Sequence, residues 1–151
     1  MPGKPMLWSV AKPLTATYVV CACALAVAQN SWLTLVGDPA DSQADTVQVD
    51  VQSRLANTTQ PTLNVRVSRS SLRSGWDNVP YRSYTSTLVV DCVEKTARYL
   101  DATFYMMPLW QGKPHTTSNF SPLETRPMAF PDVAPNPAAS IIKAACVATA
   151  R

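Results

Sequence analysis

The sequence predicts an α+β fold that is mostly β: an antiparallel sheet of five to six strands with one short C-terminal helix tied to it by a disulfide. Three observations predict this fold. Several segments alternate apolar and polar residues, which is the period of a β-strand. The C-terminal segment changes to the spacing of an amphipathic helix. Cys92 and Cys146 are the two cysteines that follow the N-terminal region, enough for one bridge.

Residues 62–69 give the clearest strand pattern. Leu63, Val65 and Val67 alternate with polar residues, as in a strand with one buried and one wet face. Residues 46–52 repeat the pattern with valine at every second position, and a polar connection of hairpin length joins the two segments. The further predicted strands, rich in β-forming residues, are 32–36, 84–93 and 97–107.

Two stretches carry no strand period. Residues 70–80 contain Ser, Gly, Asn and Pro, so we expect a loop with Trp76 either tucked beneath it or exposed for contact. Residues 108–137 are rich in proline, which lacks the N–H that a central strand must donate. This second stretch should therefore hold only short edge strands.

The predicted helix spans residues 138–148. Asn136 is a good N-cap, and Pro137 suits the first helical position because its missing N–H has no partner there. Cys146 lies on the apolar face of this helix, and Cys92 lies at the end of a predicted strand. We expect one disulfide between them, which closes a loop of about 55 residues and contributes roughly 4 kcal/mol in the chain-entropy model.

Residues 1–28 are predicted to be a signal peptide and residues 29–151 a single domain. Two lysines precede an uncharged run that is shorter than the roughly 20 residues of a membrane-spanning helix, and an A-x-A site ends at Ala28. The alternatives are a lipoprotein with its lipid anchor at Cys23 and an N-terminal anchor that is not cleaved. We expect an exported protein in the periplasm, on the outer surface or secreted, without a membrane span after cleavage.

No catalytic, metal-binding or cofactor-binding residue is predicted. His115 is the single histidine, no G-x-S-x-G motif occurs, and the acidic residues are scattered. The formal net charge is +3, and two of the lysines that produce it lie in the predicted signal peptide. This charge does not favour nucleic-acid binding. We expect no enzyme, although a small hydrolase with two converging carboxylates stays open.

A candidate contact surface includes residues before, within and after the loop at residues 70–80. Arginine and tryptophan are frequent anchors of protein interfaces, and a guanidinium pairs well with carboxylate or sulfate groups. In the alternative, Arg66 is a solvated outer-face residue and Trp76 caps the core. A second aromatic group, residues 99–110, is either ordinary core or a dimer seam. The candidate contact residues are Arg66, Arg69, Arg73, Trp76 and Arg82.

The order of these features resembles the bacterial surface-adhesin E family. The matching parts are Trp32 after the signal, the alternating residues 65–67, the Val-Asp-Cys at 90–92 and the helix that carries Cys146. The resemblance covers roughly residues 31–148. It implies an antiparallel sheet with a disulfide-linked helix, adhesion to host matrix and plasma proteins, and pairing of subunits as a homodimer.

We therefore expect a non-enzymatic, adhesin-like binding protein of the envelope or cell surface. It would contact a protein partner, either a host matrix protein or an envelope protein, through an exposed sheet face or edge. The alternative function is that of a periplasmic accessory or structural protein, with or without a lipid anchor, that binds an envelope partner.

Overall fold

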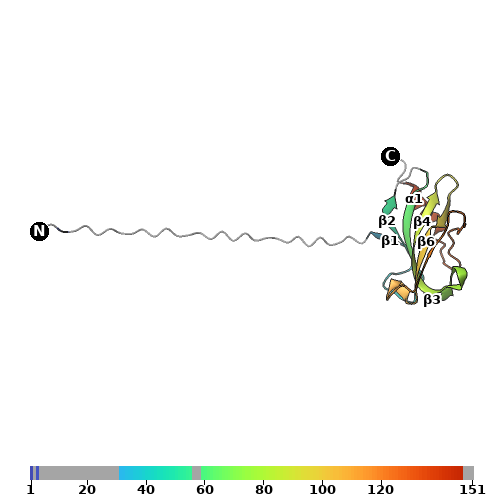
Figure 1. Ribbon diagram of the computed structural model, residues 1–151, viewed down its shortest axis with the longest axis horizontal. Coiled ribbons are helices and arrows are strands. Elements are labelled where there is room, and N and C mark those ends of the chain that lie inside the picture. The colour runs from blue at the N-terminus through green and yellow to red at the C-terminus, as the bar shows by residue number, and fades with distance from the viewer. Residues whose placement is uncertain (2, 4–30, 56–58, 148–151) are drawn as a thin grey trace.

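Figure 1 shows the computed structural model, which describes residues 1, 3, 31–55 and 59–147. The predicted signal peptide, its cleavage site after Ala28 and the alternative lipid anchor at Cys23 lie outside the described residues. They stay predictions. Among the described residues, no helix combines the length and the apolar character that crossing a membrane requires.

The described chain forms one antiparallel sheet of seven strands in the order β1-β2-β3-β4-β6-β7, with β5 also paired to β4. The antiparallel sheet is confirmed, with more strands than expected because residues 97–107 divide in two. Leu100 separates the halves, and they pair with different parts of β4. The strands are β1 (Trp32–Val36), β2 (Thr46–Leu55), β3 (Thr62–Ser74), β4 (Pro80–Asp91), β5 (Thr96–Tyr99), β6 (Asp101–Tyr105) and β7 (Thr116–Asn119).

The expected loop at residues 70–80 is shorter than predicted. Strand β3 continues to Ser74, a single 3-10 turn η1 (Trp76–Asn78) follows, and β4 begins at Pro80. The β3–β4 register shifts between Ser68 and Arg73. Such a bulge breaks the alternation of side chains while the strand goes on, so the period disappears from the sequence before the strand ends.

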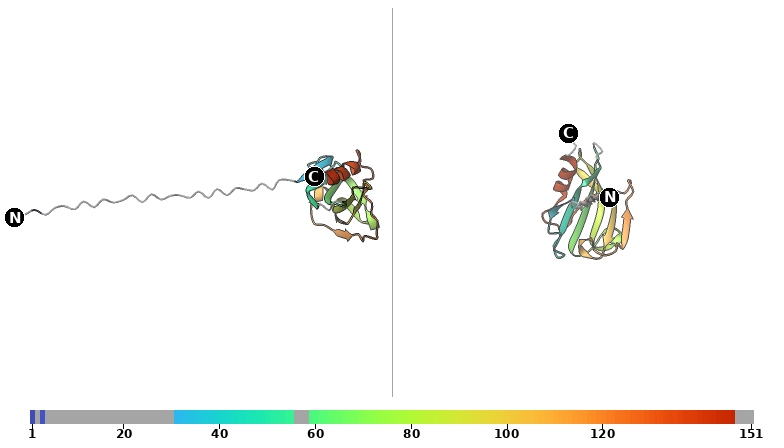
Figure 2. Two further views of the ribbon diagram at one scale, coloured as in Figure 1. Left: turned by 90° about the horizontal axis from the view of Figure 1, so that it is seen from above. Right: turned by 90° about the vertical axis from the view of Figure 1, so that its left-hand side faces the viewer.

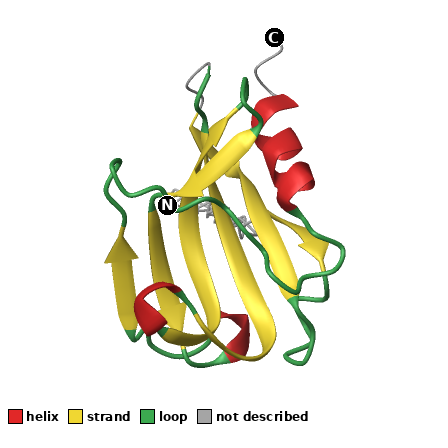
Figure 3. Cartoon of the chain, turned by 90° about the vertical axis from the view of Figure 1, so that its right-hand side faces the viewer, coloured by secondary structure: helices red, strands yellow, loops and turns green. Residues whose placement is uncertain are grey.

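One face of the sheet carries the core. Helix α1 (Ala138–Cys146) lies on this face near β2 and β4 and buries Ile141 and Ala145 completely (Figures 2 and 3). Asn136 Oδ1 accepts the Ala138 N–H at 3.0 Å, but the helix begins at Ala138 with Pro137 in the N-cap position predicted for Asn136. The largest fully buried apolar side chains are Tyr99, Phe104, Leu63, Leu88, Ile141, Val47, Val49, Val65, Val67 and Val90.

The segment between β7 and α1 also covers the core face. Its Phe130 is 3% exposed and its Val133 is 5% exposed, and both belong to the core cluster. Residues 126–128 run beside β5, where Met128 N–H donates to Ala97 O at 2.8 Å. These contacts and the four-residue β7 agree with the short edge pieces predicted for this proline-rich stretch.

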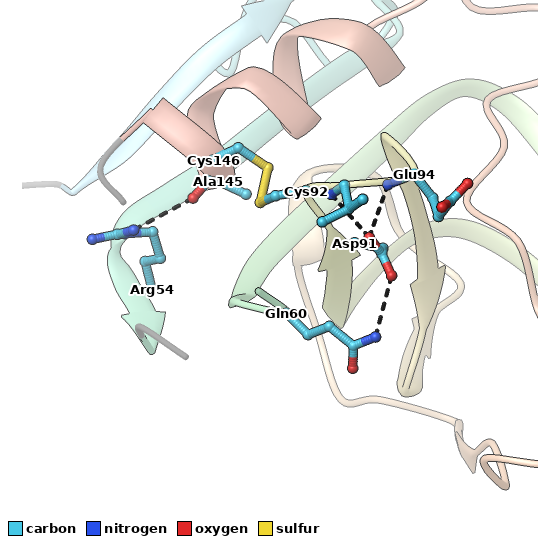
Figure 4. The surroundings of a disulfide bond; sticks show 8 residues. Arg54, Gln60, Asp91, Cys92, Glu94, Ala145 and Cys146 are labelled. Carbon is cyan, nitrogen blue, oxygen red and sulfur yellow. Dashed lines mark hydrogen bonds between the residues drawn. A yellow bond between two sulfur atoms is a disulfide. The ribbon is translucent and has the colours of Figure 1, made fainter. Parts of the chain in front are cut away.

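The disulfide joins Cys92 and Cys146 as predicted, with their Cα atoms 5.6 Å apart (Figure 4). It ties the end of β4 to the end of α1. Beside it, hydrogen bonds from the backbone N–H of Glu94 and the side chain of Gln60 lower the pKa of Asp91. A second 3-10 turn, η2, spans Pro108–Trp110. The bridge and the turn at Asp91 lie at one end of the sheet, and η1 and η2 lie at the other end (Figure 3).

Candidate functional site

The sheet face opposite α1, here called the open face, is polar. Strand alternation produces it, since the residues between the core valines of β2 and β3 point to this side. Most of its side chains are half-buried or exposed, and Gln48 is the buried member of the central row. That row of cross-strand partners crosses six strands and consists of Thr34, Gln48, Arg66, Thr85, Thr103 and Thr117.

Arg66 lies between two tryptophan rings on the open face. Its guanidinium carbon is 4.2 Å from the centroid of Trp32 and 4.1 Å from the centroid of Trp110. Both distances lie well inside the range of about 6 Å over which an aromatic face attracts a cation. We call Trp32, Arg66 and Trp110 the indole–guanidinium stack.

Hydrogen bonds fix the stack from below. Arg66 Nε donates to Gln48 Oε1 at 2.7 Å, and Gln48 Nε2 donates to Thr34 Oγ1 at 2.8 Å. Trp110 Nε1 is shared between the carbonyl oxygens of Val67, at 3.2 Å, and Tyr84, at 3.0 Å. The guanidinium and the Trp110 ring are therefore held by β1, β2, β3 and β4 together.

Trp110 reaches this position through a strained turn. Leu109 and Trp110 have φ angles of 54° and 59°, in the left-handed region that bulky residues rarely adopt. Two serine hydroxyls hold the turn: Leu109 N–H donates to Ser68 Oγ at 2.9 Å, and Trp110 N–H donates to Ser83 Oγ at 3.0 Å. Strain of this kind persists only where the surroundings enforce it, and it often marks a functional position.

The guanidinium of Arg66 keeps free donor groups. Its Nη atoms make no hydrogen bond with any residue that the structure describes. Burial lowers the pKa of Arg66 and the Asp50 carboxylate raises it, and an arginine remains charged at neutral pH in either case. The stack therefore presents a fixed, planar cation that can bind a carboxylate or sulfate in bidentate fashion.

Two of the other predicted contact residues, Arg69 and Arg73, contact the segment between β7 and α1, which covers the core face. Arg69 is 2% exposed, donates from Nη2 to Pro131 O at 3.0 Å, and has Nε at 3.4 Å from Asp45 Oδ1. Arg73 Nη1 lies 3.5 Å from Asp132 Oδ2, the next residue of the same segment. Arg69 is thus used inside the fold, whereas the Arg73–Asp132 pair lies at the surface, with side chains 36% and 73% exposed.

Trp76 and Arg82 also make internal contacts. The Trp76 ring packs edge-on against Tyr99 and Phe120, with centroid distances of 4.7 and 5.1 Å, so it is tucked against the core. Arg82 donates to Arg69 O at 3.1 Å and to Ser42 O at 3.0 Å. Of the five predicted contact residues, the structure places Arg66 on the open face and does not gather the others around it.

Sequence reasoning missed Trp32 and Trp110 as partners of Arg66. The alternation of β1 was a usable signal for Trp32, because that residue shares its parity with the polar Thr34. No local signal predicts Trp110, which a turn brings across the sheet. Within the predicted group 99–110, Tyr99 and Phe104 are buried core, whereas Met106 and Met107 are 47% and 50% exposed.

His115 makes structural contacts. Its Nε2 lies 2.7 Å from Pro80 O and therefore donates to it, and its Nδ1 lies 2.8 Å from Thr116 Oγ1. Both ring nitrogens are thus engaged in joining β7 to the start of β4. Among the described residues, no three His, Cys, Asp or Glu side chains gather so as to hold a metal ion.

The chain matches the model of a known protein family. The family model described as surface-adhesin protein E matches residues 32–147, which include every strand, the helix and both bridged cysteines. No curated protein and no solved structure matches the chain. The family implies an exported or surface location and an adhesive role. The chain belongs to the surface-adhesin protein E family.

Proposed function

We propose that this protein is a non-enzymatic surface adhesin that contacts a protein partner through the open face, with the indole–guanidinium stack at the centre of the contact. The stack is the observation that supports this proposal. It places the residue types that most often dominate interface energetics on a polar sheet face, and it fixes them before the partner arrives. Such preorganisation reduces the entropy that binding must overcome.

The chemistry of Arg66 specifies the partner group. Its Nη atoms donate no hydrogen bond to any residue that the structure describes. The complementary partner group is therefore a carboxylate, supplied by an Asp or Glu side chain. Thr85 and Thr103, which follow Arg66 in the central row, offer small hydroxyl groups that donate and accept hydrogen bonds at the rim. The partner is therefore a protein with an exposed acidic side chain on a face that can lie against a sheet.

Binding of the exported protein to immobilised matrix and plasma proteins tests this proposal. Arg66→Gln keeps a hydrogen-bonding group and removes the charge, and it should weaken binding by tenfold or more, equivalent to about 1.4 kcal/mol. Thr117→Ala, on the same face but away from the stack, is the matched control. Equal binding by Arg66→Gln and the unchanged protein would contradict a role for the stack.

The location of the protein separates adhesion from the periplasmic alternative. We expect an impermeant amine-reactive label to modify the protein on intact cells, because Lys95 and Lys143 are exposed. Labelling only after the outer membrane is opened would instead support an accessory role inside the envelope.

A further inference from the structure

A small pocket lies on the open face beside the stack. It has a volume of about 200 Å³, and its lining comes from four strands, β1, β3, β4 and β6. Pockets that hold drug-sized ligands usually measure about 300–1,000 Å³, so this one fits a single ring. Its walls are formed by Trp32, Asn64, Val65, Thr85, Ser86, Thr87 and Asp101.

Trp32 is the aromatic residue of the pocket lining. It also stacks on Arg66, whose guanidinium carbon lies 4.2 Å from the centroid of the indole. Arg66 is in turn fixed by Gln48. The cation therefore restrains the ring that borders the pocket, and a ligand stacking there would meet a wall already in place.

The opposite side of the pocket is polar and partly unused. Asp101 Oδ1 accepts the Thr87 N–H at 2.9 Å, and Ser86 Oγ donates to the carbonyl oxygen of Asp101, so the carboxylate is held in one position. The side-chain amide of Asn64 and the hydroxyls of Thr85 and Thr87 make no hydrogen bond with a residue that the structure describes.

The charge of the lining selects among ligands. Asp101 is its charged residue, and neither Lys nor Arg belongs to it. An anionic ligand in the pocket would meet the Asp101 carboxylate at close range. A neutral ring with several hydroxyl groups can donate to Asp101 and exchange hydrogen bonds with the amide and the threonine hydroxyls.

We propose that this pocket binds one neutral pyranose sugar. The C–H face of the sugar stacks on the indole of Trp32, and its hydroxyl groups bond Asp101, Asn64, Thr85 and Thr87. The sugar site goes beyond the protein contact proposed above and adds Asp101, Asn64 and Thr87, to which that contact assigns no role. A ligand of this size in an open site binds in the millimolar range, so a surface glycan would engage it through several adhesin copies.

NMR titration of the ¹⁵N-labelled exported protein tests the site. The probes are the methyl glycosides of glucose, galactose, mannose and N-acetylglucosamine, each up to about 50 mM, a range suited to millimolar affinity. At least one should shift the indole N–H signal of Trp32 and the side-chain amide of Asn64. N-acetylneuraminic acid, which carries a carboxylate, should cause much smaller shifts.

Two variants and a control sharpen the titration. Asp101→Asn keeps the shape and still accepts the Thr87 N–H, yet it should lower sugar affinity about tenfold because a charged acceptor is lost. Thr87→Val, which keeps the volume and removes the hydroxyl, should reduce it less. Thr117→Ala should bind sugar like the unchanged protein.

Three results would overturn the sugar site: no shift at Trp32 with any neutral glycoside, equal or stronger binding of the acidic sugar, or full sugar binding by Asp101→Asn. The two proposals fail separately. Protein binding that depends on Arg66 without any sugar response removes only the sugar site. A sugar response without protein binding removes only the protein contact.

Discussion

Arg66 and Arg69 lie close together on β3, yet they face different surroundings. Arg69 is almost fully buried and donates to a carbonyl oxygen of the segment that covers the core. Arg66 lies on the open face between two indole rings and leaves its Nη groups unused by the described chain. One arginine holds the fold together, and the other is available to a partner.

The same division extends to the two faces of the sheet. The covered face receives α1, the disulfide and the segment that contains Phe130 and Val133, so its side chains contribute mainly through burial. On the open face, side chains are held by hydrogen bonds, such as the bond from Arg66 to Gln48, and by the contacts of the Arg66 guanidinium with two tryptophan rings. Changes on the covered face should therefore alter stability, and changes on the open face should alter binding.

Removing the disulfide should have the largest effect. The variant Cys92→Ser with Cys146→Ser opens a loop with a sequence separation of 54 residues and should lose about 4 kcal/mol of unfolding free energy. Binding through the open face should not change at a temperature where the variant is folded. Chemical denaturation and the partner-binding assay measure the two quantities. An unchanged denaturation midpoint would show that α1 is held by packing alone.

The pair Arg69→Met and Arg66→Met tests the comparison directly. Arg69→Met should cost about 3 kcal/mol, because Asp45 and the Pro131 carbonyl lose a buried cationic partner. Arg66→Met should cost less, about 1–2 kcal/mol, because Arg66 is half-buried and the variant leaves the buried Gln48 Oε1 without its donor. Partner binding should fall only in Arg66→Met. Equal losses of stability in the two variants would abolish the distinction between the faces.

The sequence was sufficient for the strands of the covered face because burial leaves a periodic pattern, but it did not predict that Phe130 and Val133 cover them. An apolar residue at every second position of β2 and of the first half of β3 predicted which side is buried, and two remaining cysteines predicted the bridge. The open face has no such pattern. The contact of Arg66 with Trp110 joins residues far apart in the chain through a left-handed turn, and a sequence pattern does not encode that geometry. The grouping of arginines by sequence proximity therefore mixed residues with different roles.

Alkaline pH should destabilise the covered face. Burial raises the pKa of Tyr99 from 10.0 to about 12, and burial raises that of Tyr84 well above its ordinary value. Because the folded state holds these protons more tightly, stability is complete below pH 10 and falls as the pH rises through 12. Tyr99 alone accounts for about 2 kcal/mol by pH 12.

Denaturation midpoints followed with tyrosinate absorbance from about pH 8 to pH 12 check this dependence. The two phenols form a short chain in which Tyr84 Oη lies 3.0 Å from Tyr99 Oη, which donates to Ala129 O at 3.3 Å. The double variant Tyr84→Phe with Tyr99→Phe should show a much smaller alkaline loss. If the double variant loses as much stability at alkaline pH as the unchanged protein, groups other than these two tyrosines cause the loss.

Trp110→Phe should have the smallest effect on stability and a clear effect on binding. It removes one indole N–H that serves two carbonyl oxygens, which should cost about 1 kcal/mol. Phenylalanine also attracts a cation less strongly than tryptophan, so Arg66 should be less firmly fixed and the partner should bind several-fold more weakly. Trp76→Phe, which alters a ring packed on the covered face, is the matched control and should leave binding unchanged. If both variants weaken binding alike, partner affinity depends on the stability of the whole sheet and not on the geometry of the stack.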